Sequence, residues 1–596
     1  MSAIIKDNRI PTIIRLSKRA FWKYKFQIVF LIILGFLAGL LEGVGVNALI
    51  PLFSFVMGDG QGGDDFISQA IEKFFSYFNI NFNLKYMLVF ICILFVFKAI
   101  ATLYINYIKI KITSDYEEKT RSELFDKTLQ ANWPYLLKQK LGHLENTLMI
   151  DINYSSSLLN QIAGAITVAT GLLMYTLIAV NISLFITLST LALGGVMFLV
   201  FKPLIYKTRM IAYERNAMNK QIAHFVNENI IGLKSIKALR IGEKISKIGE
   251  KYFKELKKME IKTFLIGSIS SSLFQPISII FISIIFVISY NTSNFNFASL
   301  IAVVYLIQKI FVYLQSAQAN MHSINSYYPY LKNVLDYQGR AINYKEEDCG
   351  TNHFIFNNSL EFNNVIFSYK TEKKVLSSIN FSIKKGEMVG LIGSSGSGKT
   401  TIVDLMLRLF NPTSGCIYLD GKDVNTISIK EWRSNIGYVS QDIFLINGTI
   451  ADNIKFYSNI TNEEMEKVAK MANIYDFIQS REDKFKTFIG DRGILLSAGQ
   501  RQRIIIARIL ARKPKILVLD EATSALDNES ELKIQKVIES LKGKITVFVI
   551  AHRLSTVINS DRLLVLEKGK IVEQGEPDKL LNNKNSYFHK VYNIRK

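Results

Sequence analysis

Cysteine is scarce in this chain: its 596 residues include only Cys92, Cys349 and Cys416. The three lie far apart, in no C-x-x-C pair and with no histidine at ligand spacing, so we expect reduced thiols, no disulfide framework and no structural zinc. Acidic residues are also few: 50 Asp and Glu against 72 Lys and Arg leave a formal net charge of +22. Such an excess fits a nucleic-acid binder or a protein held against an anionic membrane surface, and the distribution of charge decides between them.

Apolar residues, by contrast, are abundant. They make up 49% of the chain, and the mean hydropathy of +0.19 is too high for an ordinary soluble protein. The length points to several domains. Six stretches each reach the ~20 apolar residues that a membrane-spanning helix needs. They lie at about residues 27–56, 84–109, 157–179, 182–204, 263–290 and 296–320.

The basic residues fall on one side of these spans. Seven of them precede the first span against the single acid Asp7, and the loops 110–156 and 205–262 hold many lysines. The loop 57–83 is acidic, and the turn 291–294 carries no charge. By the positive-inside rule we expect a multi-pass protein of the cytoplasmic (inner) membrane with both termini cytoplasmic. This topology explains much of the positive charge without nucleic acid.

The acidic outer loop contains an amphipathic pattern. Large apolar residues recur there at helical spacing: Phe66, Ala70, Ile71, Phe74, Phe75 and Phe78. The pattern predicts a short helix. It fits a helix lying on the outer membrane surface and a helix that caps the bundle equally well.

Three ionisable residues fall inside the predicted spans: Glu42, Lys98 and Lys309. A charge in hydrocarbon costs at least ~2.5 kcal/mol, so such residues usually face a partner or a cavity. All three lie ~20 Å from the predicted outer end of their span, which predicts one charged layer. The simpler interpretation is an internal Glu–Lys pair plus a lysine that extends to the interface. The alternative is a substrate cavity whose net positive charge suits an anionic head group.

A glycine-rich octet follows the apolar pair Leu391-Ile392 and precedes a helix-like segment beginning at Thr401. Its residues are Gly393, Ser394, Ser395, Gly396, Ser397, Gly398, Lys399 and Thr400. The order of strand, glycine-rich loop and helix is typical of a phosphate-binding loop, in which backbone N–H groups and the helix N-terminus face the phosphates. We expect Lys399 to reach the β and γ phosphates of ATP, and Thr400 to hold Mg²⁺.

The segment 516–521 reads Ile-Leu-Val-Leu-Asp-Glu, an apolar strand that ends in two acids. Four consecutive apolar residues favour a central strand of a parallel sheet. In such a position Asp520 is predicted to join the Mg²⁺ shell, and Glu521 to polarise the attacking water.

Between these motifs lies Leu496-Ser497-Ala498-Gly499-Gln500. With it the chain resembles ATP-binding-cassette transporters, whose signature loop reads LSGGQ. The resemblance covers nearly the whole chain, since six spans followed by one cassette is the arrangement of a half-size exporter. It implies that Ser497, Gly499 and Gln500 contact ATP held by the phosphate loop of a second cassette. Ala498 departs from the usual glycine, which is harmless in a right-handed helical turn but strained at positive φ.

The same resemblance assigns roles to four further residues. It implies that Tyr369 stacks on adenine and that Gln441 contacts Mg²⁺ and the attacking water. Asp527 matches the aspartate that crosses the interface between two cassettes, and His552 matches the histidine that contacts the γ-phosphate. Thr401 completes the expected ATP site.

These predictions define the expected fold. It is a six-helix transmembrane α-bundle with long cytoplasmic helical loops, followed by an α/β P-loop ATPase domain. We place the transmembrane domain at 1–338, a linker at 339–358 and the nucleotide-binding domain at 359–596. One cassette per chain with every catalytic position intact implies a homodimer that works by alternating access.

The cassette itself does not identify the cargo. The leading hypothesis is ATP-driven flipping or export of an amphipathic membrane lipid, above all a lipid-linked glycan, because of the two lysines and the amphipathic outer helix. The chain as a whole also resembles bacterial lipid-linked oligosaccharide flippases, including the acid of the first span in Leu41-Glu42-Gly43. Two alternatives remain open: a multidrug or small-peptide exporter, and an ATP-gated channel or regulatory ATPase.

Overall fold

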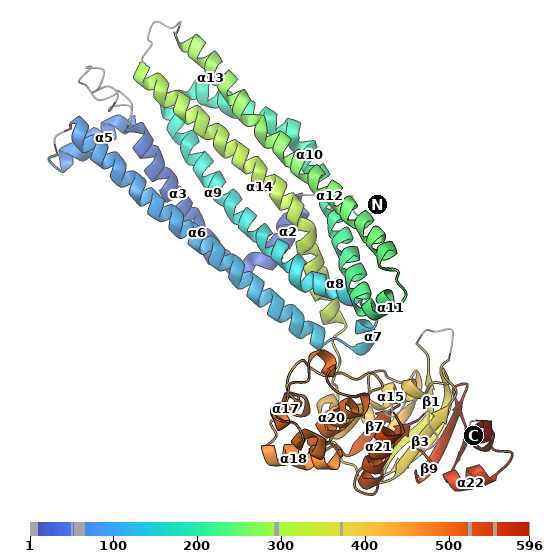
Figure 1. Ribbon diagram of the computed structural model, residues 1–596. Coiled ribbons are helices and arrows are strands. Elements are labelled where there is room, and N and C mark those ends of the chain that lie inside the picture. Colours follow the sequence, from blue (N-terminus) through green and yellow to red (C-terminus); the bar gives the residue numbers. More distant parts are fainter. Residues whose placement is uncertain are drawn as a thin grey trace. The chain divides into compact units, whose positions relative to one another are not determined.

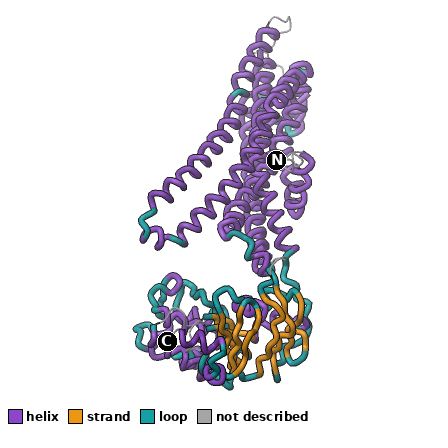
Figure 2. The backbone as a smooth tube through the Cα atoms, turned by 90° about the vertical axis from the view of Figure 1, so that its right-hand side faces the viewer, coloured by secondary structure: helices purple, strands orange, loops and turns teal. Residues whose placement is uncertain are grey.

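The computed structural model describes residues 10–48, 52, 66–80, 82–290, 297–369, 374–521, 527–551 and 557–594. The chain divides into two compact units, which are described separately (Figure 1). The first comprises Met1–Ala131 and Tyr135–Lys345, and the second comprises Asn132–Pro134 and Glu346–Lys596. In Figure 2 the strands all lie in the second unit, and the first unit is helical.

The unit that precedes residue 346 is built of helices, and the longest of them run side by side (Figure 1). Its helices are α2 (Ile10–Phe21), a 3₁₀ turn (Trp22–Tyr24), α3 (Lys25–Asn47), α5 (Phe66–Tyr77), α6 (Leu84–Leu129), α7 (Trp133–Leu136), α8 (Leu141–Asn146), a π-helical turn (Thr147–Asp151), α9 (Ile152–Ile182), α10 (Leu184–Ile231), α11 (Leu233–Ala238), α12 (Gly242–Ser272), α13 (Phe274–Tyr290) and α14 (Phe297–Asn343).

Three of these helices extend far beyond the predicted spans. With 46, 48 and 47 residues, α6, α10 and α14 are each ~70 Å long, more than twice the thickness of a hydrocarbon core. Hydropathy marks only the apolar part of each helix, so the sequence predicted the polar continuations as long cytoplasmic helical loops and did not show that they continue the same helices. Five helical stretches of the described residues are long and apolar enough to cross a membrane. The sixth predicted span lies in α14, and the predicted turn 291–294 lies outside the described residues.

Small residues bring α3 and α9 together. Gly35, Gly39 and Gly43 repeat every fourth residue along α3, and a Cβ at any of them would crowd α9 side chains. A stripe of this kind lets two helix backbones approach closely inside a membrane, where apolar burial provides little driving force. The stripe turns the adjoining Glu42 into the bundle, where it is buried. Helix α14 packs against both α9 and α10.

The predicted outer helix forms as α5. Its Ile71 and Phe75 are buried against Ala48 and Met87, while Phe74, Tyr77 and Phe78 stay exposed. One face of α5 therefore packs on the bundle, as expected of a capping helix.

The second unit is built on two sheets and the helices around them. Its strands are β1 (Ser359–Phe367), β2 (Leu376–Lys384), β3 (Met388–Gly393), β4 (Ser414–Leu419), β5 (Lys422–Asp423), β6 (Ile436–Val439), β7 (Ile516–Asp520), β8 (Thr546–Ile550), β9 (Arg562–Glu567) and β10 (Lys570–Gly575). Its helices are α15 (Lys399–Met406), α16 (Ile429–Asn435), α17 (Ile450–Lys455), α18 (Asn462–Met471), α19 (Tyr475–Gln479), α20 (Ala498–Ala511), α21 (Asn528–Leu541), α22 (Pro577–Asn582) and α23 (Tyr587–Ile594), with short 3₁₀ turns between them.

The larger sheet has the order β10-β9-β3-β8-β7-β6, and all of its pairs are parallel except β10 with β9. The smaller sheet, β2-β1-β4-β5, is antiparallel. Apolar residues of α15 are buried in the core shared by β1 and β3, whereas α20 and α21 belong to the core on the other face. Parallel pairing brings the carboxyl ends of β3, β7 and β6 to one edge of the sheet.

Candidate functional site

The phosphate-loop octet connects β3 to α15, as the sequence predicts. Two of its glycines have positive φ, +77° at Gly396 and +108° at Gly398, a region that side-chain-bearing residues rarely adopt. A Cβ at Gly393 would collide with the carbonyl oxygen of Leu566 in β9. The loop therefore needs glycine at these three positions.

Two polar side chains of the octet are turned inward. Lys399 Nζ donates to the carbonyl oxygens of Gly393 and Ser394, at 3.0 Å each. Among the described residues, the buried Ser397 hydroxyl has no hydrogen-bond partner. A buried hydroxyl and a lysine ammonium in one glycine-rich loop are donors that fit a phosphate group. Thr400 is exposed in the first turn of α15.

The neighbouring strands bring Asp520, Glu521 and Gln441 to the same edge. Asp520 ends β7, and Glu521 follows it with φ of 50°, a strained value for this residue type. Gln441 follows the adjacent strand β6, and its Nε2 donates to Glu521 Oε2 at 2.7 Å. The structure thus joins a glutamine and a glutamate that lie 80 residues apart.

Burial, together with the charge of Glu521, raises the pKa of Asp520 to about 6. The hydroxyl of Tyr438 donates to Asp520 Oδ2 at 3.5 Å, and this residue was missed by sequence reasoning. In the sequence only one feature indicates a role for Tyr438, its position three residues before Gln441.

The donor set at this edge fits a hard divalent cation. A hydroxyl, a carboxylate and an amide oxygen, from Thr400, Asp520 and Gln441, are the oxygen ligands that Mg²⁺ prefers. The raised pKa of Asp520 indicates a buried charge that a cation would stabilise.

Tyr369 lies beside the phosphate-loop helix. Its hydroxyl is 3.1 Å from Thr401 Oγ1, and its ring meets Phe367 and Phe410 edge-on. The ring is half-exposed and can receive a flat ligand. The arrangement brings two of the predicted ATP-site residues, Tyr369 and Thr401, into contact.

Asp404, one turn into α15, was also missed from the sequence, although it is the only acid of that helix. Burial raises its pKa to about 6 from the ordinary 3.8. A charge held in such a site destabilises the fold, at ~1.4 kcal/mol per unit of pKa difference.

We therefore expect Asp404→Asn to stabilise the protein at pH 8 by up to ~3 kcal/mol. Because the folded pKa lies above the unfolded one, the gain should be full above pH 6, shrink between pH 6 and 3.8, and vanish below. Thermal unfolding of the full chain as a function of pH measures this. A loss of stability at pH 8 would contradict it.

The signature residues open α20. Ser497 Oγ accepts from the Gln500 N–H at 3.2 Å, and Gln500 Oε1 accepts from the Ser497 N–H at 2.9 Å, which forms a capping box. Ala498 is the first residue of the helix, and its φ is not positive, so alanine causes no backbone strain here. Gly499 is buried, and a Cβ there would lie 2.6 Å from Cβ of Ser530, a contact the sequence did not reveal.

Asp527 caps α21: its Oδ2 accepts from the Ser530 N–H at 3.1 Å. Hydrogen bonds from the Ser530 hydroxyl and then from its N–H hold the Asp527 pKa below its usual range. The predicted γ-phosphate contact, His552, lies outside the described residues.

The three charged residues of the predicted spans come together in the first unit. Lys98 Nζ and Lys309 Nζ lie 2.8 Å and 2.9 Å from the same atom, Oε1 of Glu42. The Glu42 side chain is 5% exposed, and the lysines are 27% and 30% exposed. We call these three residues the charged triad. The simpler sequence interpretation, one Glu–Lys pair plus a separate lysine, is wrong, because both lysines contact the glutamate.

Comparisons with known proteins agree with this architecture. Residues 28–317 match the family described as ABC transporter transmembrane region, and residues 376–524 match the family described as ABC transporter. The heterocyst differentiation ATP-binding protein HepA of Nostoc sp. (strain PCC 7120 / SAG 25.82 / UTEX 2576) is 32% identical over 472 residues, which cover 78% of this chain and 77% of that protein.

A second relative matches over a shorter stretch. The ABC multidrug transporter MDR2 of Trichophyton rubrum (strain ATCC MYA-4607 / CBS 118892) is 43% identical over 239 residues, which cover 39% of this chain and 18% of that protein. The solved structure of a bacterial Atm1-family ABC exporter with ATP bound has the same fold, with a TM-score of 0.79 and 21% identity over 96% of this chain and 98% of that one.

The chain therefore belongs to the ATP-binding cassette transporter family, as an exporter in which a membrane-spanning domain is fused to an ATP-binding domain that couples ATP hydrolysis to transport.

Proposed function

We propose that this exporter flips or exports an amphipathic lipid with an anionic head group, in the most specific form a lipid-linked glycan, by alternating access. The observation that carries the proposal is the charged triad, where two lysines share one carboxylate oxygen. Two positive charges against one negative charge leave a net charge of +1. An ionised group inside a membrane domain is costly, so an unbalanced charge is typical of a ligand or ion pathway.

Aromatic rings support this reading of the triad. Lys309 Nζ lies 5.4 Å from the ring centre of Tyr305, and Lys98 Nζ lies 5.6 Å from that of Phe95. The face of an aromatic ring attracts a lysine ammonium by about 0.5–2 kcal/mol. Both lysines remain partly accessible, so an anion can approach them while Glu42 stays covered.

A cavity in the same unit, apart from the charged triad, favours the second candidate, a multidrug or small-peptide exporter. It has a volume of about 530 Å³ and lies among α9, α10, α12 and α14, with Arg215, Gln315 and His322 in its wall. Gln318 also lines it, and among the described residues both polar atoms of this buried side chain lack a hydrogen-bond partner. Unsatisfied amides suit a polar uncharged or peptide-like cargo.

The test is ATP hydrolysis by the full chain in liposomes, with lipid-linked glycans, phospholipids, peptides and hydrophobic drugs added in turn and Glu521→Gln as the blank. The proposal predicts stimulation by lipids with a phosphate or diphosphate head group. Stimulation only by peptides or drugs, lost in Gln318→Leu but kept in Lys98→Gln, would replace it with the second candidate.

At the ATP site we propose that the phosphate loop and Lys399 hold the phosphates and that Tyr369 stacks on adenine. Thr400, Asp520 and Gln441 would hold Mg²⁺, which would neutralise charge on the phosphates, while Glu521 polarises the attacking water. His552 would contact the γ-phosphate. We further propose that the protein lies in the cytoplasmic membrane with both termini inside.

We also propose a homodimer in which Ser497, Gly499 and Gln500 of one chain complete the ATP site of the other. Gly499→Ala tests the placement of this loop, since the added methyl would overlap Ser530 of the same chain. An overpacked contact costs ~1–3 kcal/mol, so hydrolysis is expected to fall about tenfold while ATP binding to the phosphate loop persists.

Ala498→Gly, one residue away, serves as the matched control and is expected to leave the rate nearly unchanged. Adding Ser530→Gly to Gly499→Ala removes the atoms that clash and is expected to restore activity. Failure of that rescue would show that the methyl does not act through Ser530.

A further inference from the structure

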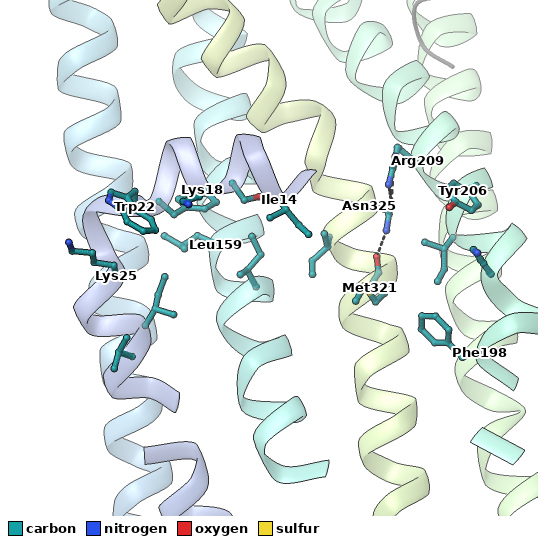
Figure 3. A pocket seen from close by; sticks show the side chains of 18 of the residues that line it. Ile14, Lys18, Trp22, Lys25, Leu159, Phe198, Tyr206, Arg209, Met321 and Asn325 are labelled. Carbon is teal, nitrogen blue, oxygen red and sulfur yellow. Dashed lines mark hydrogen bonds between the residues drawn. The ribbon is translucent and has the colours of Figure 1, made fainter. Parts of the chain in front are cut away.

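A second cavity of the first unit, of about 810 Å³, lies beneath α2 (Figure 3). Helix α2 crosses the long helices there, and its Ile14 faces the same space as Leu159 of α9 and Phe198 of α10. We propose that this cavity binds a membrane lipid with a phosphate head group, its acyl chains against the apolar wall and its head group at a basic rim. The inference does not depend on the identity of the transported cargo.

The rim carries charge of one sign. Four cationic residues line the cavity, Lys18, Lys25, Lys202 and Arg209, and among the described lining residues none is acidic. They come from α2, α3 and α10. In Figure 3 Lys18 and Lys25 lie on one side of the cavity, and Arg209 lies on the other, where it is buried and its Nε donates to Asn325 Oδ1 at 2.8 Å. Such a basic pocket between helices is typical of sites for anionic lipid head groups.

The depth of the cavity fits a head group. Lys25 precedes the first predicted span, Leu159 lies near the start of the third, Lys202 near the end of the fourth, and Met321 follows the sixth. All four positions belong to the same predicted boundary of the membrane, the cytoplasmic one. A lipid bound there keeps its head group in the interface and its chains in the hydrocarbon.

An interfacial aromatic residue marks this boundary. Trp22 is 54% exposed, and the Nζ atoms of Lys18 and Lys25 lie 4.6 Å and 5.5 Å from the centre of its ring. Tryptophan favours the level of lipid head groups, and here it stands between two cations that line the cavity. It is also a built-in reporter, because the chain has only three tryptophans.

The experiment uses the full chain in phosphatidylcholine nanodiscs without ATP. Dibrominated phosphatidylglycerol or dibrominated phosphatidylcholine is added, and quenching of Trp22 is obtained by subtracting the emission of Trp22→Phe. Dibrominated phosphatidylglycerol is expected to quench Trp22 by half at an about fivefold lower mole fraction than dibrominated phosphatidylcholine. A preference of about fivefold is the effect of about one basic residue on the binding of an anionic lipid.

Two variants of α10 test the rim. Lys202→Gln is expected to reduce the preference to about twofold or less, whereas Lys207→Gln, an exposed lysine of the same helix outside the cavity, should leave it intact. Unlabelled polyprenyl phosphate is then added as a competitor. If polyprenyl phosphate displaces the brominated lipid at a lower mole fraction than unlabelled phosphatidylglycerol does, the cavity is a site for isoprenoid lipids. If the two competitors displace it equally, the cavity is a site for phosphate-headed lipids in general.

Equal quenching by the two brominated lipids, or an equal loss in Lys202→Gln and Lys207→Gln, would overturn the inference. So would the absence of quenching by either lipid, which would mean that a second copy of the chain covers the cavity. Because the assay needs neither ATP nor turnover, failure of the proposed flipping activity leaves its outcome unaffected.

Discussion

Glu521→Gln is expected to lower ATP hydrolysis at least ~100-fold while ATP binding persists, since a positioned base contributes ~10²–10⁴-fold. The substitution keeps the shape of the side chain, and its amide oxygen can still accept the hydrogen bond that Gln441 donates. The loop after β6 should therefore stay in place. The loss of hydrolysis then reports only the removal of the negative charge from the side chain. Hydrolysis by the reconstituted protein and binding of a fluorescent ATP analogue measure the two quantities.

Glu529→Gln provides a control with the same change of charge. Glu529 lies on the exposed first turn of α21 and forms an ion pair with Lys533 of the same helix. Its substitution is expected to leave hydrolysis within about twofold, as is usual for exposed ion pairs. Full activity of Glu521→Gln would instead assign the activation of water to another group.

Lys98→Gln or Lys309→Gln is expected to weaken stimulation by anionic lipid while basal hydrolysis remains. Either change lowers the net charge of the triad from +1 to zero and leaves Glu42 with one lysine partner, so the fold should hold. At 4 Å and an effective dielectric constant of 20 a unit charge attracts an anion by ~4 kcal/mol. The cost of removing the two charges from water offsets part of this attraction. We therefore expect the lipid concentration that gives half-maximal stimulation to rise at least ~tenfold.

Removing both lysines is a poorer experiment, because Glu42 would become a buried carboxylate without a counter-ion, at a cost of ~3–5 kcal/mol. The triple variant Glu42→Gln, Lys98→Gln, Lys309→Gln avoids this by removing all three charges. It should fold, hydrolyse ATP at the basal rate and respond to no anionic lipid. Lys85→Gln with Lys251→Gln, two exposed lysines of the same unit, is the control. Unchanged stimulation in the triple variant would contradict a role of the triad in cargo recognition.

Much of the fold could be predicted because its signals are local. The run Ile516–Asp520 is a buried strand in the sheet, and the glycine-rich octet does connect a strand to a helix. Span lengths were less predictable, since helices such as α6 continue far past their apolar part with ordinary polar residues.

What the sequence could not provide are contacts between distant segments. Glu42 and Lys309 lie 267 residues apart, and equal depth in the membrane did not reveal that both lysines contact one oxygen atom. Gly499 matches a motif, but its close approach to Ser530 depends on how α20 packs against α21. Asp404 is an ordinary helix residue in the sequence, and only burial makes its carboxyl unusual.

The most direct test of the account is lipid translocation itself. A fluorescent polyprenyl-diphosphate saccharide is placed in proteoliposomes, ATP is supplied outside, and the fraction protected from the impermeant reductant dithionite is followed. Protection is expected to rise with ATP in the wild type and to stay flat in Glu521→Gln and in the triple variant of the charged triad. A flat trace in a wild type that hydrolyses ATP and accumulates a peptide or drug would contradict it.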